Sequence, residues 1–417
     1  MPRTAFYTTL QQEVDRVEAA SVSKRHERVI ESFTKGPNPK AMIGGKEYNI
    51  FNSNDYLGLR HHAALKKAEL AASEEFGAGP GAVRFISGSL KVHRDLEKAL
   101  AAFHGRADGM VFSSAFATNM GVLFSLLRGQ NKDSKLQDNP LVISDELNHR
   151  SIIDGIRIAN MGEAKAIFKH LDAASLREVL TASVGKYDRV LVVTDGVFSM
   201  LGEFQDLAGV RKVVDEFDAQ FPNGVLLVVD DAHGVAASGA TGRGTEEVAG
   251  VKADVLIGTL GKGFGADGGY VVADQVVIDY LRESAATYIY SNSISPATAG
   301  AALASVELLS QPEGQKLVAT LTGHIGSFKT QMLAAGFSFA ADSNHAVQPL
   351  LVGDAAKCKA LTQALFEAGY LVTNLSYPVV TKGRDEIRIQ LSAAQTAEDI
   401  AGFVAAVTKA GKSVGVI

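Results

Sequence analysis

Short apolar runs alternate with helical patterns through the middle of the chain. Between about residues 51 and 298, several runs rich in Val, Ile and Leu have the length and composition of buried strands. The best candidates are Gly109–Ser113, Leu141–Ser144, Ala166–Lys169, Val190–Thr194, Val225–Asp230, Val255–Thr259 and Gly269–Ala273. Stretches between them, such as Leu171–Val184 and Leu207–Phe217, have helical spacing. This alternation predicts crossover connections and an α/β fold with a mostly parallel sheet.

The two ends of the chain follow other patterns. Residues 4–32 have helically spaced apolar positions and predict one polar amphipathic helix, with a strand at Tyr48–Phe51 after the breaker Gly36–Pro39. Beyond residue 298 the pattern predicts an α+β tail. Its helices are expected at 297–310, 314–335 and Ala397–Ala410, and its strands at Val347–Leu351, Tyr370–Thr373 and Glu386–Leu391. We therefore expect an N-terminal helix and strand segment (1–50), a large α/β domain (51–298) and a smaller α+β domain (299–417).

Composition narrows the class of protein. The 417 residues are 46% hydrophobic and 21% charged with a net charge of −5, and the dispersed Lys and Arg residues argue against nucleic-acid binding. The only cysteine is Cys358, which excludes an intrachain disulfide and a thiolate metal cluster, and we interpret it as a packing residue. The N-terminus lacks the apolar core of a secretory signal, and no apolar stretch reaches membrane-spanning length. A cytoplasmic location is therefore expected.

The strongest candidate chemistry lies after two of the predicted strands. Asp230 and His233 follow one apolar run, and Lys262 follows the next one among small glycines. Parallel strands present such residues together at their carboxyl ends. An accessible lysine amine can form a Schiff base with a carbonyl cofactor, and a carboxylate can pair with a pyridinium nitrogen. The pattern indicates a pyridoxal-phosphate enzyme with no metal.

Each part of this pattern also has a simpler interpretation. Asp230 and His233 alone are typical of a turn with a capping aspartate, and a metal pair would need further ligands that stand at no obvious spacing. Gly258–Gly265 resembles a phosphate-binding P-loop, but Gly263 stands where that loop requires Ser or Thr. Gly77–Gly81 follows a charged helical pattern rather than a strand, so we expect a glycine loop that shapes a tight pocket near the site.

Three further segments carry weaker signals. Ser113–Asn119 follows a strand and opens a helix, whose N-terminal N–H groups suit a phosphate, although an ordinary Ser N-cap has the same pattern. His149 follows another strand and is either structural or stacked on a flat ring. Arg388 alternates with apolar residues in a strand, where it either faces solvent or grips a carboxylate bidentately.

With these residues assembled, the chain resembles the α-oxoamine synthase family of fold-type-I pyridoxal-phosphate enzymes from about residue 45 to its end. The motifs that carry the resemblance are Ser53-Asn54-Asp55-Tyr56-Leu57-Gly58-Leu59, Val83-Arg84-Phe85-Ile86-Ser87-Gly88-Ser89 with His93, Asp195-Gly196-Val197-Phe198-Ser199-Met200, Asp230-Asp231-Ala232-His233-Gly234 and Gly258-Thr259-Leu260-Gly261-Lys262. The resemblance implies a mostly parallel seven-stranded sheet with helices on both faces. It also implies a homodimer with shared active sites.

The resemblance implies a role for each matching residue around the cofactor. Lys262 forms the Schiff base, Asp230 pairs with the pyridinium nitrogen, His233 bonds the phenolic oxygen and His149 stacks on the ring. Freed Lys262, with a lowered pKa, then removes the α-proton of the substrate.

The phosphate and the substrate have their own implied partners. Thr259 and the backbone at Ala115 and Phe116 hold the phosphate, with Ser291 added from the partner subunit. Arg388 binds the carboxylate of the amino acid, Asn54 of the partner subunit reaches the substrate, and Ser199 lies near the cofactor.

The implied reaction joins an amino acid to an acyl-CoA thioester and releases CoA and CO₂, giving an α-amino ketone or its β-keto acid precursor. Ser376–Gly383, Ile387–Ala393 and Ser291–Ser293 are similar to the glycine C-acetyltransferase branch, and Val83 beside Arg84 favours a small amino acid. Met200-Leu201-Gly202 is similar to the serine palmitoyltransferase branch instead, and the polar stretch 128–140 is longer than the first branch needs. Glycine with a short acyl chain is the prediction. A long-chain synthase, a CoA-independent aminotransferase or lyase and a non-catalytic partner subunit are the alternatives.

Overall fold

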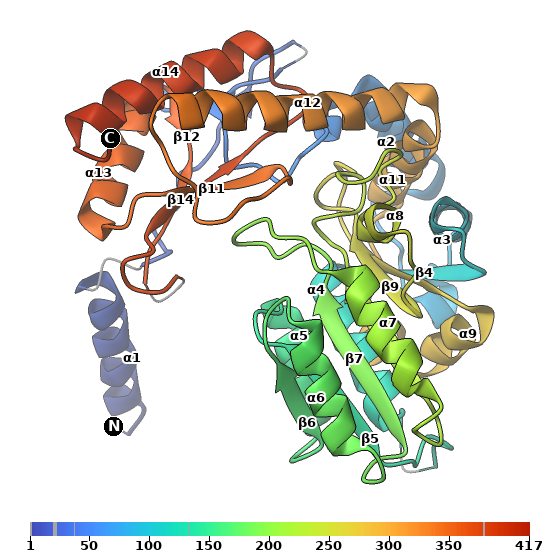
Figure 1. The fold of residues 1–417 in the computed structure, drawn as a ribbon. Helices are drawn as coiled ribbons and strands as arrows, with labels where there is room; N and C mark the ends of the chain where they lie inside the picture. Colours follow the sequence, from blue (N-terminus) through green and yellow to red (C-terminus); the bar gives the residue numbers. More distant parts are fainter. Residues whose placement is uncertain (1, 20–22, 37, 132, 378–379) are drawn as a thin grey trace. The chain divides into compact units, whose positions relative to one another are not determined.

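The computed structural model describes residues 2–19, 23–36, 38–131, 133–377 and 380–417. It contains two compact units, Met1–Asn49 and Ile50–Ile417 (Figure 1). The expected domain boundary near residue 298 falls inside the second unit and stays a prediction.

The first unit holds a helix followed by a small antiparallel hairpin. Helix α1 spans Pro2–Ala19, and the strands are β1 (Ser32–Phe33), β2 (Ala41–Ile43) and β3 (Lys46–Ile50). Gly44 and Gly45 connect β2 to β3 with φ angles of 56° and 73°, which glycine adopts without strain. The predicted single helix over 4–32 is wrong for 23–31, and residues 20–22 lie outside the described part. The Glu31 N–H donates to the Met42 carbonyl at 2.9 Å, so pairing with β2 overrides the helical spacing there.

The second unit is built around a seven-stranded sheet in the order β4-β10-β9-β8-β7-β5-β6. The strands are β4 (Asp108–Phe112), β5 (Pro140–Asp145), β6 (Lys165–Phe168), β7 (Arg189–Asp195), β8 (Val225–Asp230), β9 (Val255–Thr259) and β10 (Gly269–Ala273). Only β10 runs antiparallel to its neighbours β4 and β9. All seven strands were predicted, and the bounds of β8, β9 and β10 are those expected from the sequence.

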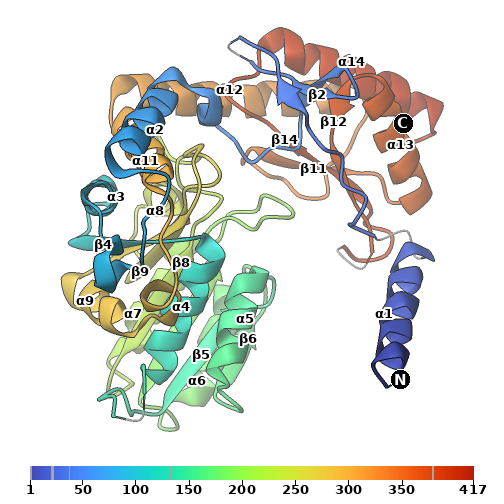
Figure 2. The ribbon, with the colours of Figure 1, turned by 180° about the vertical axis from the view of Figure 1, so that it is seen from behind.

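Both faces of this sheet are covered, which explains why its strands are apolar throughout. In β7, Val190 and Val192 pack into one hydrophobic cluster, whereas Leu191 and Val193 pack into another on the opposite face. The first cluster includes helices α3 (Lys91–His104), α6 (Ala173–Ser183) and α7 (Leu207–Asp218), and the second includes α4 (Ala115–Arg128), α5 (Arg150–Ala159) and α9 (Gln275–Ser284). Figures 1 and 2 show the sheet from its two sides. The predicted fold-type-I α/β architecture is confirmed.

A smaller sheet follows, in the order β11-β14-β13, with β14 antiparallel to both neighbours. Its part of the chain comprises α11 (Pro296–Leu309), α12 (Pro312–Ala334), β11 (Val347–Leu351), α13 (Ala355–Glu367), β12 (Tyr370–Leu371), β13 (Thr373–Leu375), β14 (Glu386–Gln390) and α14 (Ala397–Ser413). Ile387 and Ile389 of β14 enter the hydrophobic core, so Glu386 and Arg388 project from the other face of the strand. The α+β prediction for this region is confirmed.

Short elements connect these layers. They are η1 (Leu59–His61), α2 (Ala63–Phe76), η2 (Arg84–Gly88), α8 (Thr245–Ala249) and α10 (Ala286–Ile289). The glycine loop that follows α2 was expected to shape a pocket, but Gly77, Gly79 and Gly81 have open space where a side chain would project. That prediction is wrong for this chain. None of the described helices is long and apolar enough to cross a membrane.

Candidate functional site

The carboxyl ends of three adjacent strands bring the main candidate residues together. Strand β7 ends at Asp195 and β8 at Asp230, and these two aspartates are register partners. Strand β9 runs parallel to β8 and ends at Thr259, three residues before Lys262. The sequence places these residues at one edge of the sheet because each apolar run ends where the strand leaves the core.

Asp230 is buried and has hydrogen-bond partners on both carboxylate oxygens. The Asn119 Nδ2 donates to Oδ2 at 2.6 Å, and the Ala232 backbone N–H donates to Oδ1 at 3.1 Å. Asn119 also donates to the Ser151 Oγ at 2.9 Å, which anchors it between α4 and α5. This arrangement fixes the orientation of the Asp230 carboxylate.

Asp195 lies beside Asp230 and has a different electrostatic state. Burial, together with the neighbouring negative charge of Asp230, raises the pKa of Asp195 well above its usual range. The Asp195 Oδ2 accepts a hydrogen bond from the His149 backbone N–H at 2.7 Å. The raised pKa favours the protonated form of Asp195 beside the Asp230 carboxylate.

Lys262 presents its amine without a protein partner. Its Nζ forms no hydrogen bond or ion pair within the described part of the chain. Burial lowers the pKa of Lys262, although Asp230 and Asp195 oppose this shift. A lowered pKa increases the fraction of neutral amine, the form that attacks a carbonyl group. The site thus contains a nucleophilic amine close to a fixed carboxylate.

His233 is held by two aromatic residues that the sequence did not point to. Its Nδ1 lies 2.6 Å from the Tyr56 hydroxyl, and its carbonyl oxygen lies 2.9 Å from the His345 Nε2. Burial, with the charges of Lys262 and Arg388, lowers the pKa of His233 well below its usual range, so the ring is neutral. Burial raises the pKa of Tyr56 to about 12, so its hydroxyl keeps its proton. These contacts orient the imidazole.

Asn54 and Arg388 reach the same network from other elements. The Asn54 Oδ1 accepts hydrogen bonds from the Gln390 Nε2 at 2.5 Å and from the Tyr56 hydroxyl at 3.2 Å. These bonds join Asn54 to His233 of its own chain through Tyr56, and its expected reach into the site of a partner subunit stays a prediction. The Arg388 Nε donates to the Ser199 carbonyl oxygen at 2.7 Å, and the Arg388 guanidinium also interacts with the Tyr56 hydroxyl.

Thr259 and the start of α4 lie next to one another. Thr259 is the register partner of Gly269 in β10. A Cβ atom added to Gly269 would lie 2.2 Å from the Ala115 backbone nitrogen, so only glycine allows this approach. The Thr259 Oγ1 accepts from the Gly261 N–H at 3.2 Å and donates to the Gly268 carbonyl at 3.1 Å. A hydroxyl and a helix N-terminus together form a suitable anion site.

The structure places the remaining candidates less centrally. His149 caps α5, with its Nδ1 2.7 Å from the Ser151 Oγ, and its ring stays accessible. Phe116 is exposed at the start of α4. Ser291 is exposed, and among the described residues its hydroxyl has one hydrogen bond, to the Asn292 carbonyl at 3.5 Å, which does not join it to the other candidates.

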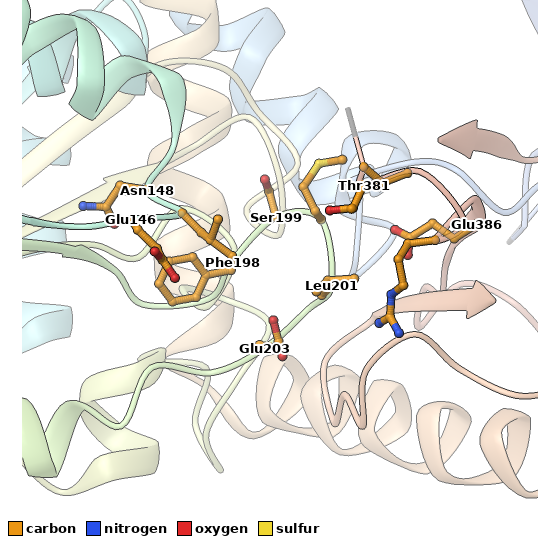
Figure 3. Close-up of a pocket in the computed structure, with 12 residues that line it drawn as sticks. Glu146, Asn148, Phe198, Ser199, Leu201, Glu203, Thr381 and Glu386 are labelled. Carbon is orange, nitrogen blue, oxygen red and sulfur yellow. The ribbon is translucent and has the colours of Figure 1, made fainter. Parts of the chain in front are cut away.

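A cavity of about 380 Å³ adjoins this site on the side of Ser199 (Figure 3). It is lined by Glu146, Leu147, Asn148, Phe198, Ser199, Met200, Leu201, Glu203, Val380, Thr381, Arg384 and Glu386. We call it the Glu386 cavity. Pro378 and Val379, which belong to a motif used for the branch prediction, lie outside the described residues. Neither Lys262 nor Asp230 lines the cavity, so it is a neighbour of the strand-end site rather than the same space.

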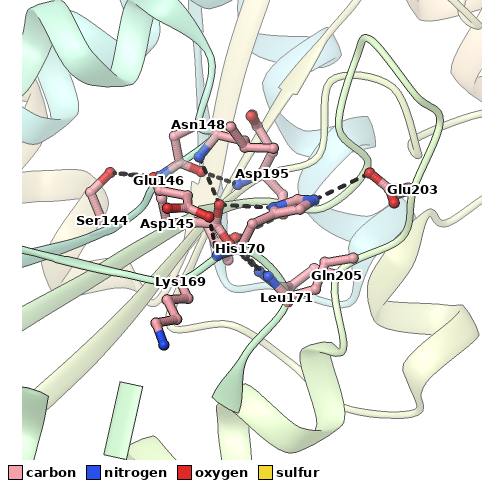
Figure 4. A network of polar contacts seen from close by, with 12 residues as sticks. Ser144, Asp145, Glu146, Asn148, Lys169, His170, Leu171, Asp195, Glu203 and Gln205 are labelled. Carbon is pink, nitrogen blue, oxygen red and sulfur yellow. Dashed lines mark hydrogen bonds and ion pairs between the residues drawn. The ribbon is translucent and has the colours of Figure 1, made fainter. Parts of the chain in front are cut away.

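His170 connects Glu203 in the wall of this cavity to Asp145 at the end of β5 (Figure 4). Its Nδ1 lies 3.0 Å from the Asp145 Oδ1, and its Nε2 lies 3.2 Å from the Glu203 Oε2. Burial alone would lower the pKa of His170, but the bonds to Asp145 and Glu203 outweigh it and raise the pKa. The raised pKa favours the protonated ring, whose charge compensates that of Glu203.

The arrangement fits pyridoxal phosphate, the cofactor expected from the sequence. An amine without a partner stands near a buried, oriented carboxylate, as an aldehyde and a pyridinium nitrogen on one ring require. The α4 N-terminus offers backbone donors for a phosphate at the same edge of the sheet, next to the Thr259 hydroxyl, which here donates to Gly268. Asn119, Asp195, Tyr56 and His345 complete the set, and none of them was assigned a role from the sequence.

Comparisons with known proteins agree with this fit. A family model described as aminotransferase class I and II matches residues 47–407. The chain is 37% identical to the 8-amino-7-oxononanoate synthase of Geobacter metallireducens, over 97% of this chain and 98% of that protein. It is also 37% identical to the 2-amino-3-ketobutyrate coenzyme A ligase of Escherichia coli strain K12, over all of both chains. Among solved structures, it is similar to the serine palmitoyltransferase of Sphingomonas wittichii, with a TM-score of 0.87 and 27% identity over 98% of each chain. A structure of SPT with a PLP internal aldimine matches with a TM-score of 0.87 and 26% identity over 99% of each chain.

Proposed function

Because this chain belongs to the aminotransferase class I and II family, we propose that it condenses a small amino acid with an acyl-CoA thioester and releases CoA. Glycine and a short acyl chain are the proposed substrates. The cofactor is pyridoxal phosphate, which the family and the solved relatives share. The relatives are named as an 8-amino-7-oxononanoate synthase, a 2-amino-3-ketobutyrate coenzyme A ligase and a serine palmitoyltransferase. These names support an acyl transfer over a simple transamination.

One observation carries this proposal: the unpartnered Lys262 amine stands at the edge of the sheet where Asp230 is oriented by Asn119. The cofactor, when bound, withdraws electrons from the α-carbon of an amino acid and so stabilises the carbanion that attacks the thioester. Lys262 holds the cofactor through its amine and then removes the α-proton, for which a lowered pKa is required. Asp230 keeps the proton on the pyridine nitrogen.

Other residues of the chain orient the two reactants. His233, fixed by Tyr56, donates to or accepts from the phenolic oxygen, and the accessible His149 ring covers one face of the cofactor. Thr259 and the backbone at Ala115 and Phe116 bind the phosphate.

The substrate and a second copy of the chain complete the proposed site. Arg388, held by the Ser199 carbonyl, uses its terminal nitrogens to grip the carboxylate of the amino acid. Asn54 of the partner subunit reaches the substrate. Because Ser291 is exposed and unconnected to the site of its own chain, we assign it to the phosphate site of a partner in a homodimer.

A second candidate function is a long-chain synthase of the serine palmitoyltransferase type. The similarity over nearly the full length to such structures favours it. This candidate predicts serine as the amino acid and a long acyl chain, whereas the first predicts glycine and a short one. The two therefore differ in substrates and share the chemistry of the strand-end site.

Thiol release separates these possibilities. The purified protein, reconstituted with pyridoxal phosphate, is incubated with glycine, alanine or serine and with acyl-CoAs of increasing length, and free CoA is measured. We expect the highest kcat/KM with glycine and a short chain. A preference for serine with a long chain selects the second candidate. Amino-group transfer to a keto acid without CoA release contradicts both, as does a protein that never takes up the cofactor.

A further inference from the structure

The Glu386 cavity lies next to the arginine that we assign to the amino-acid carboxylate. Glu386 and Arg388 are two positions apart on β14, so their side chains leave the same face of the strand. Ser199 lines the cavity and also accepts the Arg388 hydrogen bond at 2.7 Å. An amino acid held by Arg388 therefore has the cavity beside it, as space for the second substrate. At about 380 Å³ the cavity is within the size range of small-molecule sites.

Two of the three glutamates that line this cavity have protein partners. Glu203 is bonded by His170 at 3.2 Å, and Glu146 accepts the His170 backbone N–H at 3.0 Å (Figure 4). Glu146 is also exposed, so water screens its charge. These two carboxylates are stabilised without any ligand.

Glu386 differs from both. It is only 1% exposed, and its Oε1 is buried without a hydrogen-bond partner among the described residues. Figure 3 shows it in the wall of the cavity, across from Ser199 and Leu201. A buried carboxylate oxygen without a hydrogen-bond partner is costly, and because Glu386 lines the cavity, its carboxylate is placed to act on a ligand there.

Arg384 is the one arginine among the residues that line the cavity, and its charge offsets only part of the charge of the three glutamates. Arg384 is exposed, and its terminal nitrogen donates to the Ala340 carbonyl at 2.6 Å. The rest of the lining is apolar or neutral, with Leu147, Phe198, Met200, Leu201 and Val380 as its apolar members. The cavity thus combines apolar walls with an excess of negative charge.

We propose that the Glu386 cavity receives the acyl group of the thioester and selects against acyl groups that end in a carboxylate. This inference rests on the proposed acyl transfer and specifies its substrate class: an uncharged acyl group, apolar or carrying a hydroxyl or amide donor for the Glu386 Oε1. A second carboxylate in the cavity would meet the Glu386 charge in a poorly solvated space, where repulsion between like charges is strong.

Binding of two matched thioethers tests this selection without turnover. S-pentyl-CoA and S-(4-carboxybutyl)-CoA have acyl-like chains of comparable length and differ in the terminal carboxylate. Their Kd values are measured by calorimetry on the reconstituted protein at pH 8. We expect the neutral thioether to bind at least about tenfold more tightly, as one like-charge contact in a partly buried site implies. The conservative variant Glu386→Gln should reduce this preference to about threefold or less, since its amide is neutral.

Glu398→Gln is the matched control. Glu398 is exposed in the first turn of α14 and does not line the cavity, so this variant removes the same charge and should keep the wild-type preference. Equal binding of the two thioethers to the wild-type protein overturns the inference, even if Glu386→Gln does not fold. An unchanged preference in folded Glu386→Gln overturns it as well. If CoA release from acyl-CoA is observed in either case, the proposed function stands. If neither thioether binds and no acyl-CoA releases thiol, both proposals fail.

Discussion

Buried carboxylates occur both at the sheet edge formed by β7, β8 and β9 and in the wall of the Glu386 cavity. The two places differ in how many hydrogen bonds the carboxylate oxygens accept. At the sheet edge, both oxygens of Asp230 accept hydrogen bonds, from Asn119 and Ala232. In the cavity, the Glu386 Oε1 has no partner within the described residues. A satisfied carboxylate is prepared to keep its charge and position, whereas an unsatisfied one leaves its hydrogen bond for a ligand. Asp230 is therefore suited to a fixed role in the reaction, whereas Glu386 is suited to select among acyl groups.

Loss of Lys262 should give the largest effect on activity, because the proposed chemistry at the sheet edge depends on its amine. Lys262→Ala is expected to lower kcat/KM for CoA release by at least about 10³-fold, since it removes both the covalent attachment and the base. Borohydride reduction followed by peptide mass measurement should find the cofactor on Lys262 in the wild-type protein only.

Two further lysine variants show whether charge alone matters. Lys262→Arg keeps a positive charge but has no amine that condenses with an aldehyde, so it should lose as much activity as Lys262→Ala. Lys409→Ala removes an exposed lysine of α14 and should change nothing. Substantial activity in Lys262→Arg would contradict the nucleophilic role.

The two aspartates at the ends of β7 and β8 should differ in their sensitivity. Asp230→Asn is expected to lower kcat by about 100-fold, because it removes the charge that holds the pyridine proton and turns an amide donor toward the Asn119 donor. The raised pKa of Asp195 favours its neutral form, which an amide resembles, so Asp195→Asn should cost less than about tenfold. Steady-state kinetics with the cofactor in excess measure both. Equal losses would contradict the assignment of the charge to Asp230.

The sequence predicts the sheet well because each strand is a local signal. The runs that became β8 and β9 are continuously apolar since helices cover both faces of the sheet. The end of β8 marks Asp230, and the end of β9 marks Thr259 and, three residues later, Lys262. The N-terminal helix was extended too far because its spacing carries no information about pairing with β2. The local sequence pattern therefore predicts helices, strands and strand ends. It fails where the structure depends on contacts with residues far away in the sequence.

The residues missed at the site are of this second kind. Asn119 reaches Asp230 across 111 positions of the chain, Tyr56 reaches His233 across 177, and His345 reaches the His233 carbonyl across 112. Nothing near Asn119 or Tyr56 in the sequence marks these contacts. Asp195 was detectable, since it directly follows the predicted strand Val190–Thr194, and strand ends at one edge of a parallel sheet are a general place to look. Likewise, the burial of Glu386 depends on loops far from β14 in the sequence.

Tyr56→Phe should lower kcat/KM moderately, because it removes a hydrogen bond that orients His233 but keeps His233 itself. The variant loses the 2.6 Å contact to the His233 Nδ1 and the link to Asn54, but keeps the aromatic packing. One hydrogen bond of about 1–1.5 kcal/mol corresponds to about a tenfold loss of kcat/KM. The absorption spectrum of the bound cofactor should also shift, because its phenolic oxygen contacts a less ordered imidazole. A wild-type spectrum and rate would show that His233 is oriented by other contacts, such as that of His345.

The smallest expected effect is on the free energy of unfolding, and it tests the buried, unsatisfied carboxylate of Glu386. Burial raises the pKa of Glu386 to about 7, although Arg384 and Arg388 oppose the shift, and the nearby Glu203 adds to it. In the unfolded chain the same carboxyl titrates near its ordinary value of about 4.3. Between these two values the unfolded chain has released its proton while the folded protein keeps it, so the free energy of unfolding falls as the pH rises.

Glu386→Gln should remove this loss. Relative to the wild-type protein, the variant is expected to gain on the order of 1–2 kcal/mol of unfolding free energy at pH 8 and nothing at pH 4, where the carboxyl is neutral in both states. Thermal and urea unfolding of the cofactor-free protein at the two pH values measure the difference, with Glu398→Gln as the control that should show no such gain. A variant that is less stable than the wild-type protein at pH 8 would mean that the Glu386 carboxylate has a stabilising partner. The contrast with Asp230 would then no longer hold.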